Sequence, residues 1–273
     1  EGCTSLSEVT FADGSELNFI GTGAFNECTS LKEIILGNKV EIIEGNAFAY
    51  SGLVNAVIPS GISETSSTYG DHLDIQDVFK GCVKLQNLTL GSESVDLCEY
   101  DSTSYPDRVL SDLKKLVLLD SVKTIVRGDY CTAEEIVLSN GITELDKATF
   151  ESCPNLKKVT LPAGLTEIPE SLFEDCEKLE EVQMGDKIQK IGASAFYGCC
   201  NLKKMEFPDS LVDIGGSAFR ACRELKEVEL PEGLKTIGSL AFSNVEIITI
   251  PASVSSIGYH AFCNEKLKLI CFK

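Results

Sequence analysis

Hydrophobic residues recur along this chain at a fixed spacing, and the pattern is clearest from Leu156 to Phe242. A phenylalanine returns every 23 residues, and a cysteine follows each of the first four by three positions. Between them, apolar residues repeat as L-x-x-V-x-L-P and then as L-x-x-I. The members of the two series are Phe150, Phe173, Phe196, Phe219 and Phe242, with Cys153, Cys176, Cys199 and Cys222. The chain is therefore predicted to be an array of similar structural units.

A period of about 20–29 residues with an L-x-x-L-x-L core is typical of a leucine-rich repeat, in which one repeat forms one coil of a solenoid. A single coil exposes its apolar face, and stacked coils bury it continuously. Each L-x-x-L-x-L predicts a short parallel strand that ends at the following Pro or Gly, because proline has no N–H for the ladder. The Ala-Phe-x-x-Cys segment predicts a tight turn or one short helix, and the Leu-x-x-Ile-Gly segment predicts a second short extended row. The expected fold is a leucine-rich-repeat solenoid, mainly β and horseshoe-like, with about twelve coils of roughly 23 residues.

Residues 1–273 are expected to form one solenoid without an internal domain boundary, cut from a longer chain because the first residues begin in mid-coil. Two polar insertions interrupt the repeat, near residues 60–78 and 91–112. Tyr130 is predicted to take the phenylalanine position of its coil, because Leu138 follows it by eight residues as Ile250 follows Phe242.

The formal net charge of −18 argues against a nucleic-acid partner, because phosphate binding needs a concentrated basic surface. The same charge disfavours binding to anionic membranes. No apolar run approaches the roughly 18 residues of a membrane span, so membrane insertion is not expected.

The cysteines of the repeat occupy one position in successive coils, so their side chains are expected to point the same way and to stay as buried free thiols. Cys98, Cys131, Cys200, Cys263 and Cys271 lie outside this series. The sequence contains no C-x-x-C pair and no clustered histidines, so neither a metal nor another cofactor is predicted. His72 and His260 are interpreted as solvated histidines without a nucleophile motif nearby, and the chain is not expected to be an enzyme.

The outward strand positions predict two rows of charged residues across neighbouring coils, about 4.8 Å apart. One row reads Lys115, Glu135, Lys158, Glu181, Lys204 and Glu227, with alternating sign. The row beside it alternates until two lysines meet at its fourth and fifth members, and it comprises Lys114, Glu134, Lys157, Glu180, Lys203, Lys226 and Glu246. Two interpretations are open. The rows are either a ladder of charges that pair with one another and stabilise the stack, or a charged docking face for a partner, with Lys203 and Lys226 as the place where the alternation breaks.

Tyr69, Tyr100 and Tyr105 stand among Ser, Thr and Asp in the two insertions. Rigid aromatic rings among small polar residues are typical of recognition loops, and long loops in compact stacks are often functional. The candidate binding residues are therefore these three tyrosines together with members of the second charged row: Lys157, Glu180, Lys203, Lys226 and Glu246. The alternative for the insertions is tolerated surface variation.

The repeat Leu225-Lys226-Glu227-Val228-Glu229-Leu230-Pro231, continued by Ile237-Gly238 and Ala241-Phe242, resembles the BspA-like class of leucine-rich repeats. The resemblance covers most of the chain and is weakest between Ser60 and Tyr130. It implies a secreted or surface-anchored adhesin-type protein that attaches to host matrix proteins or other cells, and it brings no catalytic motif.

The sequence therefore favours a non-catalytic protein-interaction module, at the cell surface or outside the cell. It would bind a macromolecular partner, such as a host extracellular-matrix or cell-surface protein, through the concave strand face or the inserted loops. A structural spacer without a ligand of its own is the alternative. Glycan binding is a third reading, weakened by the absence of Trp. The identity of the partner and the oligomeric state stay open.

Overall fold

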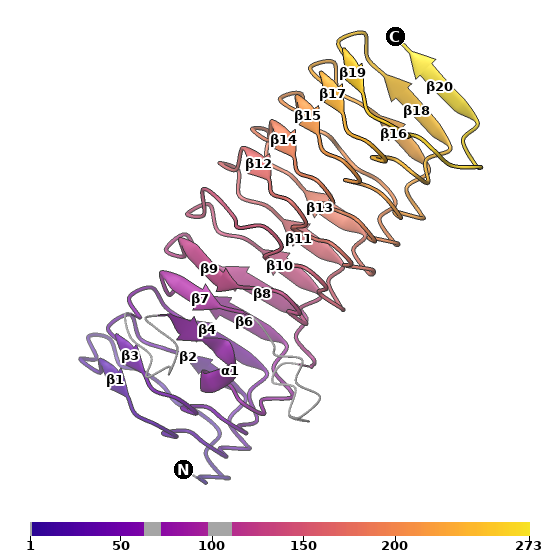
Figure 1. Cartoon of the computed structure of the whole chain (residues 1–273). Coiled ribbons are helices and arrows are strands. Elements are labelled where there is room, and N and C mark those ends of the chain that lie inside the picture. The colour runs from indigo at the N-terminus through magenta and orange to yellow at the C-terminus, as the bar shows by residue number, and fades with distance from the viewer. Residues whose placement is uncertain (1, 63–71, 98–110) are drawn as a thin grey trace. The chain divides into compact units, whose positions relative to one another are not determined.

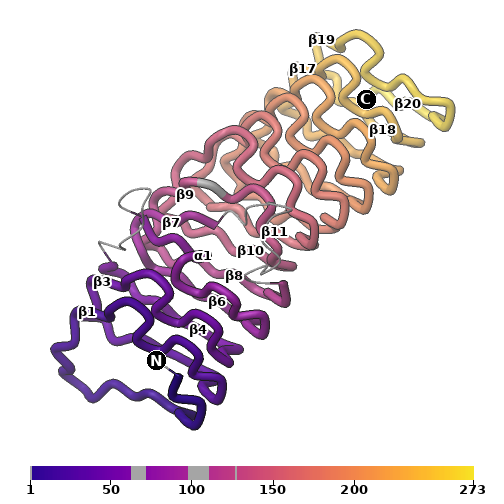
Figure 2. The backbone as a smooth tube through the Cα atoms, turned by 60° about the horizontal axis from the view of Figure 1, so that its bottom comes forward, coloured from indigo at the N-terminus to yellow at the C-terminus, as the bar shows by residue number. Residues whose placement is uncertain are grey.

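The computed structural model describes residues 2–62, 72–97 and 111–273, and it divides into two compact units, Glu1–Gly141 and Ile142–Lys273. Each unit is a stack of parallel coils with strands on two walls, as Figures 1 and 2 show. The described residues contain a single helix, which has four residues. The predicted solenoid class is confirmed, and the structure is mainly β.

In the first unit, one strand per coil forms a main wall of parallel neighbours that keep the repeat in register. These strands are β2 (Glu33–Ile35), β4 (Asn55–Ile58), β6 (Asn87–Leu90), β8 (Lys115–Leu118) and β10 (Glu135–Val137). The second wall pairs β1 (Phe19–Ile20) with β3 (Ile42–Ile43), and β5 (Leu73–Asp74) with β7 (Ser94–Asp96) and β9 (Thr124–Arg127). Helix α1 (Ile75–Val78) follows β5 directly.

In the second unit, the main wall contains β11 (Lys158–Thr160), β13 (Glu181–Gln183), β16 (Glu227–Glu229), β18 (Ile247–Ile250) and β20 (Leu269–Phe272). The second wall is one run of parallel pairs: β12 (Glu167–Ile168), β14 (Lys190–Ile191), β15 (Asp213–Ile214), β17 (Thr236–Ile237) and β19 (Ser256–Ile257). Ten main-wall strands are thus assigned among the described residues. The predicted coils that end at Phe11 and Phe207 carry none, so about ten of the twelve expected coils have a strand.

The segment around each phenylalanine is a turn in which alternate residues hydrogen-bond to the next coil. The N–H groups of Ser171, Phe173 and Asp175 donate to carbonyls 22 residues further on, over 2.9, 2.9 and 2.7 Å. Ser171 and Asp175 hold left-handed backbone angles, with φ of 56° at both, which costs a non-glycine residue about 1–2 kcal/mol. The bonds between coils and the burial of the ring offset that cost. The regular turn thus stands in place of the short helix that the sequence also allowed, except before Phe79, where helix α1 ends.

The phenylalanine rings stack on one another inside each unit. In the second unit, neighbouring ring centroids from Phe150 to Phe242 lie 5.1–5.8 Å apart with interplanar angles of 7–18°. The cysteines of the repeat lie beside the rings as buried free thiols, except for Cys3, which is exposed. Cys176, Cys199 and Cys222 each donate to the carbonyl of a phenylalanine 26 residues earlier, as Cys199 Sγ does to Phe173 O at 3.2 Å.

The prediction for Tyr130 is wrong. Its side chain is 43% exposed, and its backbone is left-handed, as at Tyr50, which lies two residues after Phe48. Counting two residues back places Gly128 in the phenylalanine position of this coil. Cys131 then occupies the cysteine position, is buried, and donates its N–H to Gly128 O at 3.3 Å. Cys131 therefore belongs to the series of buried thiols from which the sequence pattern excluded it.

Candidate functional site

The charged rows on the main walls form discrete ion pairs between adjacent coils. Lys115 lies 3.0 Å from Glu135 in the first unit, and Lys158 lies 3.1 Å from Glu181 in the second. In the neighbouring row, Lys114 pairs with Glu134, and Lys268 pairs with Glu246. The alternating charges therefore form separate pairs of adjacent coils and not one continuous ladder. Lys204, for example, pairs with Glu206 of its own coil instead of a carboxylate across the wall. Exposed pairs of this kind contribute about 0–1 kcal/mol each.

The second row breaks where the sequence pattern placed two lysines side by side. Lys203 reaches back to Glu180 at 3.2 Å, and Glu246 is taken by Lys268. The ammonium of Lys226 donates to the backbone carbonyl of Arg223. The pKa of Glu246 is lowered, first by the hydrogen bond from Lys268. The positive charge of Lys226 lowers it further. The described hydrogen bond of the Lys226 ammonium thus goes to a backbone carbonyl and not to a carboxylate.

Lys157, the remaining candidate of this row, is exposed. Its backbone carbonyl accepts from the N–H groups of Glu180 and Glu181, at 2.9 and 3.1 Å. The row members from Lys157 to Glu246 therefore lie on consecutive coils of the second unit. Tyr69, Tyr100 and Tyr105 lie outside the described residues.

An outward row of β-branched residues crosses the main wall of the first unit, and the sequence analysis did not single it out. The row takes the third position of each strand, which alternates with a buried position. Ile35 is 55% exposed, and the other members are partly exposed. The members are Ile35, Val57, Thr89, Val117 and Val137. A reading of outward positions for hydrophobicity as well as charge finds this row.

The same position on four strands of the second unit carries polar side chains. It holds Thr160, Gln183, Glu229 and Thr249 on strands β11, β13, β16 and β18. Cys271 holds it on β20, whereas Thr89 is the one polar member of the first-unit row. The coil architecture therefore does not require apolar residues at this outward position. We name the first-unit row from Ile35 to Val137 the apolar row.

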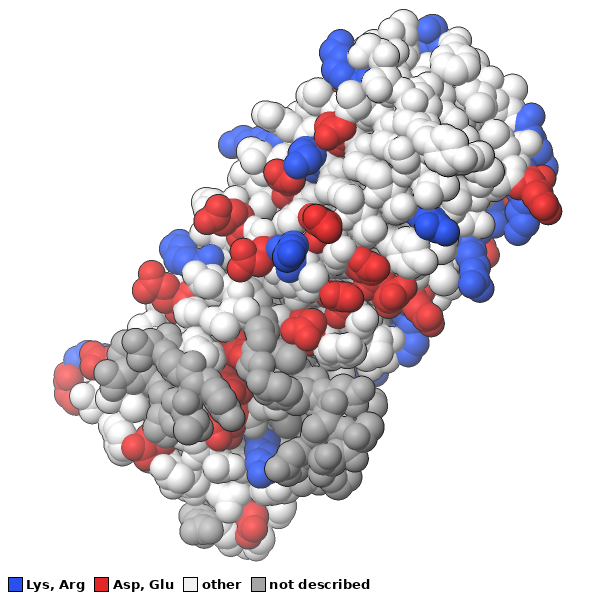
Figure 3. Space-filling view, viewed as in Figure 1, with Lys and Arg blue, Asp and Glu red and all other residues white. Residues whose placement is uncertain are grey.

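Polar residues beside the apolar row bond mainly to one another. Asn87 Nδ2 donates to Asn55 Oδ1 at 2.8 Å, and Lys115 pairs with Glu135. An apolar strip next to satisfied polar groups is the arrangement of a protein-binding surface with a polar rim. On the face drawn in Figure 3, the described charges are interspersed in sign, with acidic side chains grouped along part of the second unit.

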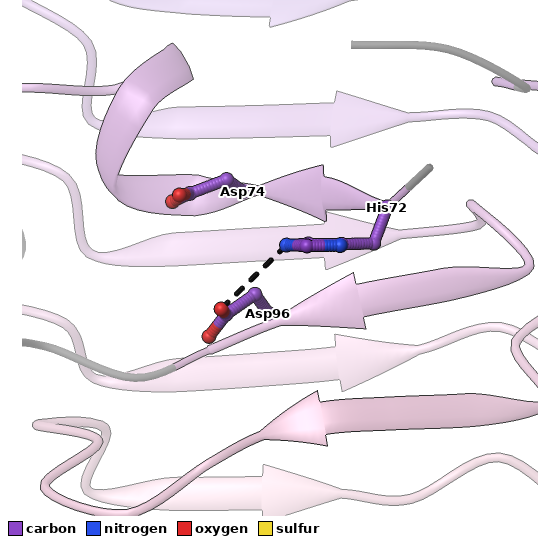
Figure 4. Close-up of side chains that lie close together, drawn as sticks. All are labelled: His72, Asp74 and Asp96. Atoms are coloured by element: carbon purple, nitrogen blue, oxygen red, sulfur yellow. Dashed lines mark ion pairs between the residues drawn. The ribbon is translucent and has the colours of Figure 1, made fainter. Parts of the chain in front are cut away.

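A histidine and two aspartates gather on the second wall of the first unit (Figure 4). His72 precedes β5, Asp74 ends β5, and Asp96 ends the adjacent strand β7. His72 Nε2 lies 3.7 Å from Asp96 Oδ2, and the two side chains are only 8% and 2% exposed. One donor atom from each of the three residues lies within 4.8 Å of the others. The interpretation of His72 as a solvated histidine is therefore wrong, because strand pairing brings it beside an aspartate that is 24 residues away in the sequence.

Asp74 also caps helix α1. Its Oδ1 accepts from the backbone N–H groups of Gln76 and Asp77, at 2.8 and 3.2 Å, while Oδ2 takes part in neither bond. Burial raises the pKa of Asp74 above its ordinary range, and the charge of Asp96 raises it further, against the hydrogen bond from Asp77. Burial also raises the pKa of Asp77, with the charge of Asp74 as the second cause. The other histidine, His260, packs against Tyr259 with ring centroids 3.8 Å apart.

Parallel coils with one leucine-rich strand per turn define a leucine-rich-repeat protein. More narrowly, the chain belongs to the BspA-type leucine-rich repeat family, whose repeat region matches residues 1–86, 108–211 and 189–273. The resemblance noted in the sequence is thereby confirmed. No curated protein matches the chain. None of the described helices has the length and hydropathy of a membrane span.

Several solved structures are similar to this chain at low sequence identity. A leucine-rich repeat protein from Bacteroides ovatus is 21% identical, with a TM-score of 0.45, and the match covers 100% of this chain and 79% of that one. The leucine-rich repeat protein of T. pallidum is 24% identical over 62% of this chain and 80% of its own, with a TM-score of 0.43. A leucine-rich cell surface protein from Faecalibacterium prausnitzii is 21% identical over 94% of this chain and 57% of its own, with a TM-score of 0.35.

Proposed function

We propose that this chain is a non-catalytic interaction module, exposed at the cell surface or outside the cell, that binds a protein through the outward face of its main strand walls. The family to which the chain belongs is built from repeats that present rows of side chains on a regular frame. The apolar row carries the proposal, because four strands of the second unit build the same wall with polar residues at this position. Its partial exposure therefore has no structural necessity, and partly exposed apolar residues gathered on one face are typical of an interaction site.

The charged rows contribute less to the proposed affinity. Most of their members neutralise one another across neighbouring coils, and a surface paired with itself gains little from a partner's charges. Lys226 is the exception, because its ammonium bonds to a backbone carbonyl. In the proposed complex the apolar row of the first unit supplies the buried contact. Lys226, on the second unit, is a separate proposed contact for an acidic group.

The test is binding of the chain to a panel of purified extracellular-matrix and cell-surface proteins, followed by variants against any partner found. The double variant Ile35→Ser with Val57→Ser removes two outward apolar side chains without touching the core. Its matched control is Gln183→Ser with Thr160→Ser, at the same strand position of the second unit. We expect the first-unit variant to lower the affinity by at least about tenfold, as loss of central apolar contacts does, and the control to leave it unchanged.

Equal affinity of both variants would remove the apolar row from the proposed site. Absence of binding across the panel would favour the alternative function, a spacer that holds another domain away from the surface. An unchanged affinity in Lys226→Glu would remove the role given to that lysine.

A further inference from the structure

Asp74 and Asp96 each directly follow a buried strand residue of the second wall, Leu73 or Val95. After the second-wall strands of the second unit this place holds a small or cyclic residue: Pro169, Gly192, Gly215, Gly238 or Gly258. In the first unit a carboxylate also stands there after β3, at Glu44. A Cβ at Gly215 or Gly238 would lie 2.5 and 2.4 Å from the backbone of the coil before. Close backbone approach thus forces glycine there, whereas the coils of Asp74 and Asp96 have room for carboxylates.

These two carboxylates are direct neighbours on parallel strands. Asp74 and Asp96 are partners in the register of β5 and β7, and like charges directly opposite one another destabilise a sheet. Asp96 is almost completely buried, so its charge also loses hydration. His72 can supply one positive charge at most. A divalent cation coordinated by both carboxylates would offset the repulsion between them.

The donor atoms are arranged around a common point. Because no two of the three donors are more than 4.8 Å apart, a point exists within about 2.8 Å of each, which is 4.8 Å divided by √3. Transition-metal bonds to imidazole nitrogen and carboxylate oxygen are about 2.0–2.2 Å long. Inward movement of each donor by less than about 1 Å would therefore complete a three-ligand set. Figure 4 shows the His72 ring directed at the space between the two aspartates.

We propose that His72, Asp74 and Asp96 bind a divalent first-row transition-metal cation of the Zn²⁺ or Mn²⁺ type. One imidazole nitrogen with two carboxylate oxygens suits these ions, whereas Ca²⁺ and Mg²⁺ favour oxygen ligands alone. The capping bonds of Asp74 use Oδ1, so its Oδ2 takes part in neither of them, and Asp96 Oδ2 lies 3.7 Å from His72 Nε2. The ion would join two consecutive coils of the first unit and stabilise that unit. The proposal does not depend on the protein partner.

The experiment uses the whole chain, freed of metal with a chelator and with accessible thiols alkylated so that cysteines do not bind the added ion. Thermal unfolding and titration calorimetry are recorded with ZnCl₂ and with MnCl₂. We expect one bound ion per chain and an unfolding temperature that rises with metal concentration. His72→Gln and Asp96→Asn should each lower the affinity by more than the roughly 10–100-fold that loss of an outer-shell partner costs.

Two matched controls separate this site from general metal binding: His260→Gln removes the other histidine, and Asp213→Asn removes an aspartate of the second wall in the other unit. Both should keep the wild-type affinity. The wild-type titration decides the question even if a variant folds poorly. An unfolding temperature that does not respond to either ion up to millimolar concentration would overturn the proposal, and so would unchanged affinity in His72→Gln.

Discussion

Replacing Phe196 with alanine tests whether the stacked rings are the main stabilising feature of the second unit. The Phe196 side chain is completely buried between Phe173 and Phe219, with ring centroids 5.5 and 5.2 Å away. Burying an aromatic ring removes at least about 150 Å² from water, which is roughly 4 kcal/mol at 25 cal/mol per Å². Two stacked neighbours add about 0.5–1.5 kcal/mol each. Because the remaining alanine still buries part of this area, we expect a loss of about 3–5 kcal/mol.

Urea unfolding followed by circular dichroism measures the change in the unfolding midpoint of Phe196→Ala relative to the wild type. The matched control is Tyr197→Ala, which removes the aromatic ring of the next residue. Tyr197 is only half-buried, and its ring lies 5.8 Å from the Arg220 guanidinium carbon, so its removal should cost about 1 kcal/mol or less. Equal losses in the two variants, or a loss below about 1 kcal/mol in Phe196→Ala, would refute the assignment of stability to the ring stack.

Three further outcomes follow from the thiols and the charged rows. Burial raises the pKa of the Cys222 thiol far above its ordinary value, so iodoacetamide should modify exposed Cys263 and spare Cys222 in the native protein; mass spectrometry showing equal labelling would contradict this. The hydrogen bond from Lys158 lowers the pKa of Glu181 below 4.5, so the pair's small contribution is complete above pH 4.5 and lost as pH falls through the lowered folded value. Glu181→Gln should therefore flatten the acid side of a urea-midpoint series against pH, and an unchanged slope would count against the pair. Lys226→Glu should change the free energy of unfolding by no more than about 0.5 kcal/mol, and a loss above 1 kcal/mol in the same assay would show that Lys226 is structural.

The repeat period predicts the coils because one physical requirement recurs in each of them. A ring every 23 residues must reach the interior, so the strands on both sides follow at fixed offsets. The prediction failed at Tyr130, where the coil has Gly128 in the ring position and only the downstream spacing was available as a guide. The left-handed residues that flank each ring, such as Ser171, also could not be inferred, because serine has no intrinsic preference for that conformation. They arise from hydrogen bonding to the next coil.

The charged rows were predictable, since outward strand positions are set by the alternation of side chains. The pairing of individual charges was not predictable, because Lys204 could pair with carboxylates of the adjacent coils but pairs with Glu206 of its own coil. The contact of His72 with Asp96 could not be predicted from the sequence either. The coil between the two residues has an irregular length, and only the register of β5 with β7 brings the two side chains together.

The pairing of charges between adjacent coils sets the step by which such an array can be lengthened. A single copied coil carrying Glu180 and Glu181 would place carboxylate against carboxylate, a repulsion that opposes strand pairing. Copying two coils together preserves the order of lysine and glutamate at both junctions. Extended versions of the second unit should therefore be assembled from coil doublets, with the doublet as the smallest insert that keeps each copied glutamate opposite a lysine.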